Sequence, residues 1–377
     1  MESIKTGNRT IKSGKFRIQP YRKLGQFGFL AIILLTGIQF AIFVHQLEKG
    51  LTPTVSRPPG VEGFLPIAAM ISLKYWLVTG VFNPVHPAGL VLLLLILLSA
   101  LLLKKGFCSW VCPFGLLSEY LAKIHTFLFK KRRDLPRWLD YPLRGFKYFL
   151  MFFFVWNIMV QMNLTDLENF MGRPYHQVMD IRMLKFFTGL SVTTGVVLLV
   201  LGFLSIGIPH FWCRYLCPYG ALMGSLSWLS PFKIHRNKKT CIDCQKCTKV
   251  CPARVQVHNS AVVWSDECNA CLQCVDVCPV NPALLGNQMY NLFYREEGNS
   301  IRGSTIQKGG VNDTLYLSVT KNKFRLKPLL YAIIIGLIFL CGTMLARLAG
   351  VWQNNISTEE YQELIKHINE PPYLYGH

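Results

Sequence analysis

The chain has 377 residues, of which 51% are hydrophobic and only 16% are charged, and its mean hydropathy is +0.30. This composition is typical of a membrane protein and excludes a disordered or collagen-like chain. Forty Lys and Arg against twenty Asp and Glu give a net charge of +20, which in a soluble protein would suggest nucleic-acid binding. Twelve of the thirteen cysteines fall into four regularly spaced groups, which excludes a secreted disulfide scaffold.

Five apolar segments approach or exceed the roughly 20 residues that a helix needs to cross a bilayer. They are 24–47, 87–103, 146–162, 186–208 and 329–350. A sixth segment, 64–82, carries Lys74 in its middle and Gly or Pro at both ends, and we expect a re-entrant or surface-lying helix there. The first segment is too long for the apolar region of a signal peptide and lacks an obvious cleavage site, so we expect it to remain as an anchor.

The positive charges indicate which side each loop lies on. Most Lys and Arg fall within 1–23, 104–147 and 209–328. Because cytoplasmic loops near spans collect positive charge, these three regions are predicted to be cytoplasmic and the C-terminal tail to lie on the outer face. The excess charge is then a matter of topology, and a nucleic-acid partner loses its support. All patterned cysteines fall on the reducing side, where thiolates bind metal.

Two stretches, 106–118 and 211–225, share the pattern Cys-x-x-x-Cys-Pro-aromatic-Gly. Each follows an apolar span, so the first four spans are predicted to be two copies of a helix pair. The four cysteines are either a third four-thiolate metal or cluster site or redox-active thiols: Cys108, Cys112, Cys213 and Cys217. Four structural cysteines are the weaker reading, because both copies keep the same Pro-aromatic-Gly continuation. After the first copy, 116–129 has the spacing of an interfacial helix with a basic end.

The strongest chemical signal is a bacterial ferredoxin run, Cys-x2-Cys-x2-Cys-x3-Cys-Pro, which occurs twice. In such pairs, three cysteines of one run and the fourth of the other hold each 4Fe-4S cluster. The predicted ligands are Cys241, Cys244, Cys247 and Cys278 for one cluster, and Cys268, Cys271, Cys274 and Cys251 for the other. Two structural zinc sites are the alternative, but zinc ribbons pair two C-x2-C units across a longer gap.

Several other residues have weaker interpretations. Basic residues around the cluster runs either dock an acidic partner or follow from topology alone: Lys233, Arg236, Lys238, Lys239, Lys246, Lys249 and Arg254. Another group could contact a quinone head group, with interfacial anchoring as the favoured reading: Arg57, Lys74, Tyr75 and His86. No His follows a C-x-x-C pair, so covalent haem is not indicated. Cys341, in the last span, reads as a small core hydrophobe.

These motifs together resemble the NapH-, NosR- and CcoG-type membrane polyferredoxins. Among these, the chain resembles the YccM type of electron transport protein, from Arg57-Pro-Pro-Gly-Val-Glu-Gly-Phe-Leu-Pro to Gly350-Val-Trp-Gln. It implies a multi-pass electron carrier of the bacterial inner membrane with two 4Fe-4S clusters held by the eight cysteines. The chain leaves no room for the external flavin domain of NosR-like proteins or the immunoglobulin-like domain of CcoG-like ones, which weakens a flavin or copper-reductase role.

The predicted fold is an integral membrane α-helical protein of about five transmembrane helices, two duplicated pairs plus one, with an inserted cytoplasmic two-cluster ferredoxin domain of the α+β class. The expected organisation is a basic cytoplasmic N-terminus at 1–23, a membrane domain at 24–232, the ferredoxin domain at 233–285, a linker at 286–328, the last span at 329–350 and a periplasmic tail at 351–377. Within the linker, 314–319 reads as a strand, and in the tail 357–360 reads as a capping box that opens one amphipathic helix through Ile368.

The predicted function is electron transfer through two clusters, between the quinone pool and a redox protein. Whether the chain is a carrier or a subunit of a quinol-linked oxidoreductase stays open. The alternative is a copper reductase or assembly factor for another metalloenzyme, in which the four C-x-x-x-C-P cysteines bind or reduce copper. A third hypothesis is a sensor or structural subunit that carries clusters without turnover. Membrane lipid is an expected partner, and nucleic acid is not.

Overall fold

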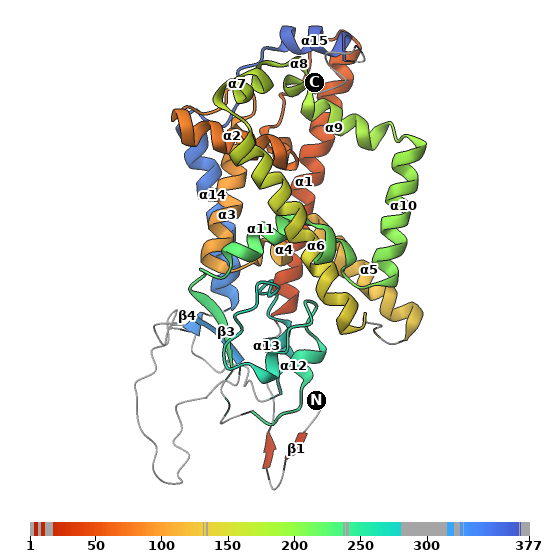
Figure 1. The fold of residues 1–377 in the computed structure, drawn as a ribbon, viewed down its shortest axis with the longest axis vertical. Coiled ribbons are helices and arrows are strands. Elements are labelled where there is room, and N and C mark those ends of the chain that lie inside the picture. Colours follow the sequence, from red (N-terminus) through yellow and green to blue (C-terminus); the bar gives the residue numbers. More distant parts are fainter. Residues whose placement is uncertain are drawn as a thin grey trace. The chain divides into compact units, whose positions relative to one another are not determined.

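The computed structural model describes residues 4–6, 9–11, 18–130, 132, 135–236, 238, 241–279, 315–319, 325–326, 328–368 and 370. These residues form two compact units, which Figure 1 draws with their elements labelled. Unit 1 comprises 1–27, 99–116 and 223–336, and unit 2 comprises 28–98, 117–222 and 337–377. The division falls inside five helices, and each unit is described by itself below.

Unit 1 contains short helices and strands around the two ferredoxin runs. Its helical elements are the start of α1 (Gln19–Glu48), α4 (Gly106–Trp110), α12 (Lys246–Lys249), the 3-10 turn Val257–Asn259 and α13 (Gln273–Val277). Its strands are β1 (Ile4–Thr6), β2 (Arg9–Ile11), β3 (Phe232–Arg236), β4 (Leu315–Val319) and β5 (Arg325–Leu326). The strands pair antiparallel in two sheets, β1-β2 and β3-β4-β5, with Phe232 opposite Val319 in the second. Strand β4 coincides with the strand predicted at 314–319, and most of the predicted linker 286–328 lies outside the described residues.

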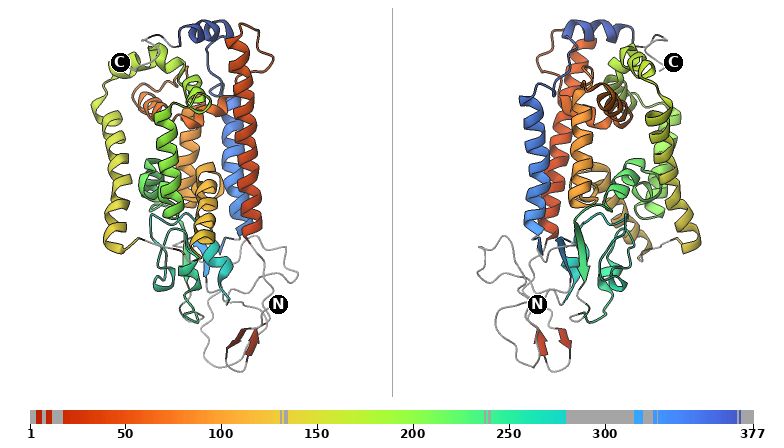
Figure 2. Two further views of the ribbon diagram at one scale, coloured as in Figure 1. Left: turned by 90° about the vertical axis from the view of Figure 1, so that its right-hand side faces the viewer. Right: turned by 60° about the vertical axis from the view of Figure 1, so that its left-hand side comes forward.

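Unit 2 is helical throughout the part that the structure describes. Its own elements are the 3-10 helix Pro59–Phe64, α2 (Pro66–Thr79), α6 (Arg137–Trp156), the π-helical turn Asn157–Gln161, α7 (Leu164–Gly172), α8 (Pro174–Gln177), α9 (Met179–Thr188), α10 (Val192–Gly207), the π-helical turn Trp212–Leu216 and α15 (Thr358–Lys366). It shares five helices with unit 1: α1, α3 (Pro87–Leu103), α5 (Pro113–Phe129), α11 (Pro218–Leu226) and α14 (Pro328–Leu348). Figure 2 shows α14 running alongside α1. The rings of Phe29 and Phe339 meet edge to face between these helices, with 6.2 Å between their centres.

The helices agree with a membrane protein. Among the described residues, three helices are long and apolar enough to cross a bilayer, Gln19–Glu48, Trp138–Gln161 and Leu329–Leu348, and a fourth span exists if the bent pair α9 and α10 counts as one. Helix α3 matches the predicted segment 87–103, and α2 lies within the predicted segment 64–82, but both are shorter than these spans. Several apolar helices are therefore confirmed, while the total of five spans stays a prediction.

The predicted span at 186–208 is the one that the structure divides. Helix α9 ends at Thr188 and α10 begins at Val192, and the two axes differ by 74°. Gly189 ends the first helix, and the Ser191 hydroxyl accepts a hydrogen bond from the backbone N–H of Thr194, which caps the second. The predicted segment 186–208 is therefore broken into two helices, because these local end signals outweigh the apolar composition around them, and its crossing of the bilayer as one span stays a prediction.

Helix α15 is packed onto α1. Tyr361, Leu364 and Ile365 are buried in one hydrophobic cluster with Phe40 and Phe43 of α1. The predicted cap at its start is present, because the Ser357 hydroxyl accepts a hydrogen bond from the N–H of Glu360 at 3.2 Å. The helix ends at Lys366, two residues before the predicted end. Figure 1 shows α15 across the end of α1.

Candidate functional site

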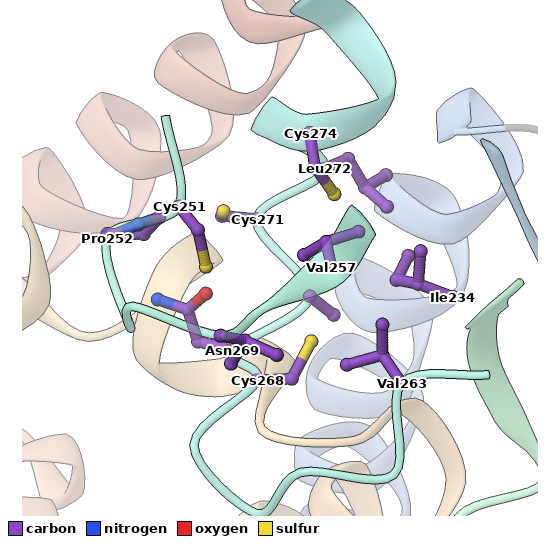
Figure 3. A pocket seen from close by; sticks show the side chains of 12 residues that line it. Ile234, Cys251, Pro252, Val257, Val263, Cys268, Asn269, Cys271, Leu272 and Cys274 are labelled. Carbon is purple, nitrogen blue, oxygen red and sulfur yellow. The ribbon is translucent and has the colours of Figure 1, made fainter. Parts of the chain in front are cut away.

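Four cysteines from both ferredoxin runs line one cavity in unit 1. They are Cys251 from the first run and Cys268, Cys271 and Cys274 from the second. Figure 3 shows their sulfur atoms directed into this cavity. The remaining lining is mostly apolar: Ile234, Pro252, Val255, Val257, Val263, Asn269, Ala270 and Leu272. The structure thus brings together the four residues that the sequence predicts for one cluster.

The cysteine loops owe their shape to residues with left-handed backbone. Ala270 has φ 48° and Leu272 has φ 58°, on either side of Cys271. In the first run Asp243 (φ 50°) and Gln245 (φ 56°) stand at the same two positions around Cys244. Alternation of right- and left-handed residues turns successive N–H groups toward one point, which makes a concave site for an anion. Both loops therefore have the backbone of a site that surrounds a negatively charged group.

The thiols of this cavity are ionised only with difficulty on their own. Burial, together with the neighbouring Cys251, raises the pKa of the Cys271 thiol to about 12. Burial also raises the pKa of Cys274 well above its usual range, and Cys271 and Cys268 add to the effect. Iron would supply the positive charge that lets four adjacent thiolates coexist, and its binding would release their protons. The apolar walls and the four sulfur donors of the cavity therefore fit a 4Fe-4S cluster.

The other predicted ligand set is more open to solvent. Burial raises the pKa of the Cys247 thiol, and the neighbouring Cys244 and Cys241 add to the rise. Cys244 is exposed, Cys247 is buried, and Cys241 and Cys278 are half-buried. Arg236 donates a hydrogen bond to the Cys241 sulfur at 3.2 Å and pairs with Asp243 at 3.3 Å. The positively charged guanidinium of Arg236 is thus in direct contact with one cysteine of this set.

Lysines near the cavity have structural contacts. Lys104, which ends the apolar helix α3, is fully buried and donates to the carbonyls of Val263 and Ser265 at 2.8 and 3.1 Å. Lys233 is also buried, donates to the carbonyls of Trp228 and Ser230, and lies 4.1 Å from the centre of the Trp264 ring. Of the basic residues that the sequence places around the cluster runs, at least Lys233 is therefore buried and does not belong to a docking surface. Burial and nearby Lys104 lower the pKa of Lys233.

The two C-x-x-x-C-P repeats have the same local backbone. The N–H of Cys112 bonds the carbonyl of Phe107 at 2.9 Å, and the N–H of Cys217 bonds that of Trp212 at 3.0 Å. Each is an i to i−5 bond, the wide turn that often marks functional sites. Proline begins the next helix in both copies, α5 and α11. The internal duplication expected from the sequence is thus visible in the geometry of both repeats.

Glycine has a different role in each copy. A Cβ atom on Gly115 would lie 1.9 Å from the carbonyl oxygen of Cys108, so only glycine fits there. The corresponding distance from Gly220 to the carbonyl of Cys213 is 3.6 Å, an ordinary contact. Cys108 and Cys112 belong to unit 1, whereas Cys213 and Cys217 belong to unit 2. A joint site of all four cysteines stays a prediction. Among the described residues, no three His, Cys, Asp or Glu side chains are close enough to hold one metal ion.

Asp140 of α6 fixes the second repeat. Its carboxylate accepts hydrogen bonds from Tyr215 at 2.6 Å and from Arg214 at 3.0 Å, both of which stand between Cys213 and Cys217. Arg144 donates to the same carboxylate at 2.5 Å. The sequence did not point to this residue, because its partners are 74 and 75 positions away.

A second buried polar group lies in unit 2 and contains two residues considered as quinone contacts. Arg57 pairs with Glu62 at 2.9 Å and with Asp180 at 2.7 Å. His86 lies 3.5 Å from Glu62 and bonds the carbonyl of His176 at 2.8 Å. Both acids and both histidines are at most 1% exposed. Arg57 and His86 are therefore bound to protein groups.

The other two residues of that prediction lie elsewhere on unit 2. Lys74 donates a hydrogen bond to the carbonyl of Met162 at the end of the π-helical turn. Tyr75 packs beside a small hydrophobic cluster of Ile71, Ile158 and Leu167. Glu62, Asp180 and His176 had no sequence signal beyond their being charged or polar residues near apolar segments. The four residues thus do not form one group.

Family models match most of the regions described above. A model described as a 4Fe-4S binding domain matches residues 85–136 and 188–237, which contain the two C-x-x-x-C-P repeats. A model described as a 4Fe-4S dicluster domain matches residues 233–279, which contain both ferredoxin runs. The double match of the first model agrees with the internal duplication.

Among curated relatives, the chain is similar to the Escherichia coli (strain K12) protein YccM, named for electron transport, with 42% identity over 92% of this chain and 89% of the relative. It is also similar to the ferredoxin-type protein NapH of Haemophilus influenzae, with 27% identity over 49% of this chain and 63% of the relative. The regulatory protein NosR of Stutzerimonas stutzeri is 27% identical over 48% of this chain and 24% of its own length. No solved structure matches.

Proposed function

The chain belongs to the YccM family of membrane proteins with ferredoxin-type 4Fe-4S domains, and from this membership we propose that it passes electrons through two 4Fe-4S clusters between the quinone pool and a redox protein. The observation that carries the proposal is the cavity lined by Cys251, Cys268, Cys271 and Cys274, whose apolar walls and inward sulfurs suit a cluster. A bound cluster accepts and releases one electron at a time.

The proposed ligands follow the crossed pattern of two-cluster ferredoxins. Cys251, Cys268, Cys271 and Cys274 hold the enclosed cluster. Cys241, Cys244, Cys247 and Cys278 hold the more exposed one, with Arg236 beside it. The two clusters differ in exposure, and this difference suggests a different redox partner for each. The exposed cluster, with Cys244 at the surface, exchanges electrons with a soluble redox protein, and the enclosed cluster exchanges them with the quinone pool.

The proposed location is the bacterial inner membrane, with the N-terminus and the ferredoxin domain in the cytoplasm and the C-terminal tail in the periplasm. The distribution of Lys and Arg supports this orientation, and reduced thiols are stable on that side. Accessibility of a cysteine placed in the tail, in a background where Cys341 is serine, would test it: labelling of intact spheroplasts by an impermeant maleimide is expected. Labelling only after lysis would reverse the orientation.

The first test is the metal content of protein purified without oxygen. We expect about eight irons and eight sulfides per chain, with signals of reduced 4Fe-4S clusters in electron paramagnetic resonance. About twelve irons would place a third cluster on the C-x-x-x-C-P cysteines, and stoichiometric zinc without iron would exclude electron transfer. Cys274→Ser should lose cluster iron, whereas Cys341→Ser, a change to a cysteine exposed on α14, should keep it all.

The second test is reduction by quinol. A quinol releases two electrons and two protons, and two clusters together can take both electrons. Oxidised protein in liposomes should lose its cluster absorbance when a quinol analogue is added. A chain that keeps all its iron but is reduced only by dithionite would remove the quinone pool from the proposal.

The alternative function is copper handling by Cys108, Cys112, Cys213 and Cys217. The observation that favours it is that both repeats keep two half-buried cysteines in the same wide turn. Replacement of Cys112 and Cys217 by serine separates the two functions. Loss of copper binding with intact cluster spectra would support copper handling, and unchanged copper binding with lost quinol oxidation would exclude it.

A further inference from the structure

The two C-x-x-x-C-P repeats direct their internal residues to different partners. Ser109 and Trp110 of the first repeat correspond to Arg214 and Tyr215 of the second. In the second repeat both side chains bond Asp140. In the first, the Ser109 hydroxyl donates to the carbonyl of Asn269 at 2.6 Å, and the Trp110 indole N–H donates to the carbonyl of Ala270 at 3.1 Å. Asn269 and Ala270 stand between Cys268 and Cys271, so the first repeat is fastened to a cluster-binding loop.

These two bonds constrain which way the loop's N–H groups face. In a trans peptide the C=O and the following N–H point in opposite directions. Turning the carbonyl of Ala270 to Trp110 therefore turns the N–H of Cys271 the other way, and Ser109 has the same effect on the N–H of Ala270. Asn269, Ala270 and Cys271 line the cysteine cavity, whereas Ser109 and Trp110 do not. The carbonyls thus face away from the cavity, and the left-handed residues Ala270 and Leu272 complete the concave backbone.

Trp110 itself is held firmly. Only 2% of it is exposed, and its ring lies 5.3 Å from that of Tyr331. The Tyr331 hydroxyl donates to the carbonyl of Leu103 at 2.7 Å. The carbonyl of Ser109 accepts hydrogen bonds from Arg22 at 3.1 Å and from Gln26 at 2.8 Å, both on α1. Because these contacts restrain the position of the Trp110 side chain, its N–H can determine the orientation of the Ala270 peptide in the cluster loop.

We propose that Trp110 is a positioning residue that sets the potential of the cluster held by Cys251, Cys268, Cys271 and Cys274. The proposal rests on the function proposed above and assigns the first repeat a part in it. Hydrogen bonds and dipoles directed at a cluster stabilise its reduced, more negative form and so raise its potential. Trp110 acts through the peptide of Ala270, whereas the side chains at the corresponding positions of the second repeat bond Asp140.

The test is a redox titration of both clusters, followed by electron paramagnetic resonance, on the full chain in detergent. Trp110→Phe keeps the aromatic ring beside Tyr331 and removes the N–H. We expect full iron content and a shift of one cluster to lower potential, with the other unchanged. Tyr215→Phe is the matched control at the same position of the second repeat, and neither potential should move. Arg236→Gln removes the charge at Cys241 and should shift only the other cluster, which identifies the two signals.

Two further outcomes decide the proposal. Ser109→Ala removes the neighbouring hydroxyl and should shift the same cluster in the same direction, so it serves as the deciding variant if Trp110→Phe fails to load iron. Unchanged potentials in the iron-loaded variants, or equal shifts of both clusters, would overturn the positioning role. Failure of the proposed function is distinguishable, because it would appear in the wild-type chain as missing iron or as the absence of two cluster signals.

Discussion

Arg57 donates from its guanidinium to the carboxylate of Asp180 at 2.7 Å, although 123 positions separate the two residues. Both side chains are buried, and Arg57 also pairs with Glu62 at 2.9 Å. One cation therefore compensates two carboxylates inside unit 2, and it joins the loop before the 3-10 helix Pro59–Phe64 to helix α9. This contact makes the stability of unit 2 sensitive to a single charge.

Arg57→Met should destabilise unit 2 strongly, by about 3–5 kcal/mol, because two buried carboxylates would lose their shared partner. The measurement is the thermal unfolding midpoint in detergent. Glu48→Gln is the control, since it removes the partner of Lys185 in a pair with both side chains at least 35% exposed, and such surface pairs contribute about 0–1 kcal/mol. Equal midpoints for the two variants would mean that the buried group adds no more than a surface pair.

Stability should fall in acid through His176. Burial and the neighbouring His86 lower the pKa of His176 well below its usual value. Below a pH of about 6.5 the unfolded chain binds a proton that the folded chain excludes, so stability decreases as pH falls, by at most about 1.4 kcal/mol per pH unit. His176→Gln should reduce the difference in unfolding midpoint between pH 7.5 and pH 5.5. An undiminished difference in this variant would assign the acid sensitivity to other groups.

Gly115→Ala and Gly220→Ala should have opposite outcomes despite their equivalent positions. The new Cβ at 115 would lie 1.9 Å from a backbone oxygen, so the turn at Cys108 must move, whereas the Cβ at 220 has room. We expect a lower unfolding midpoint in the first variant. The free energy of unfolding of the second variant should equal that of the wild type or exceed it by up to about 1 kcal/mol, because alanine has a higher helix propensity than glycine. Comparable losses in both would contradict the asymmetry between the repeats.

Asp140→Asn should loosen the second repeat without affecting the clusters. The change keeps the shape of the side chain but leaves Arg214, only 4% exposed at its side chain, without its counter-charge. Losing a charged partner of buried hydrogen bonds costs about 1–3 kcal/mol or more. Cys213 and Cys217 should react faster with a small alkylating reagent, while iron content stays constant. An unchanged alkylation rate would show that Asp140 does not restrain the repeat.

The features of the fold and of the site that could be predicted from the sequence are those determined by residues close together in the chain. Ferredoxin spacing, the Pro-aromatic-Gly repeats, the cap at Ser357 and the strand at 315–319 all depend on residues a few positions apart. Apolar runs located α1, α3 and α14 for the same reason. The break at Gly189–Ser191 was also encoded locally, but its signals stood inside a hydrophobic run that dominated the reading.

The parts that were not predictable depend on partners far along the chain. Lys104 reads as a charge that ends an apolar helix, and only the fold shows that its ammonium group binds carbonyls about 160 residues later. Asp140 likewise has no meaning without Arg214 and Tyr215. Burial of a charge is decided by where distant segments meet, and periodicity or composition carries no such information.

The place of Cys251 has a consequence for how the protein matures. It ends the first run but lines the cavity of the second, a few residues after Cys247. With the ligand sets proposed above, neither run is a self-sufficient module. A fragment with one run could not complete its own metal centre, and iron inserted into either centre would order the segment that supplies a thiolate to its neighbour. The two clusters should therefore be assembled together and, on oxidation, lost together.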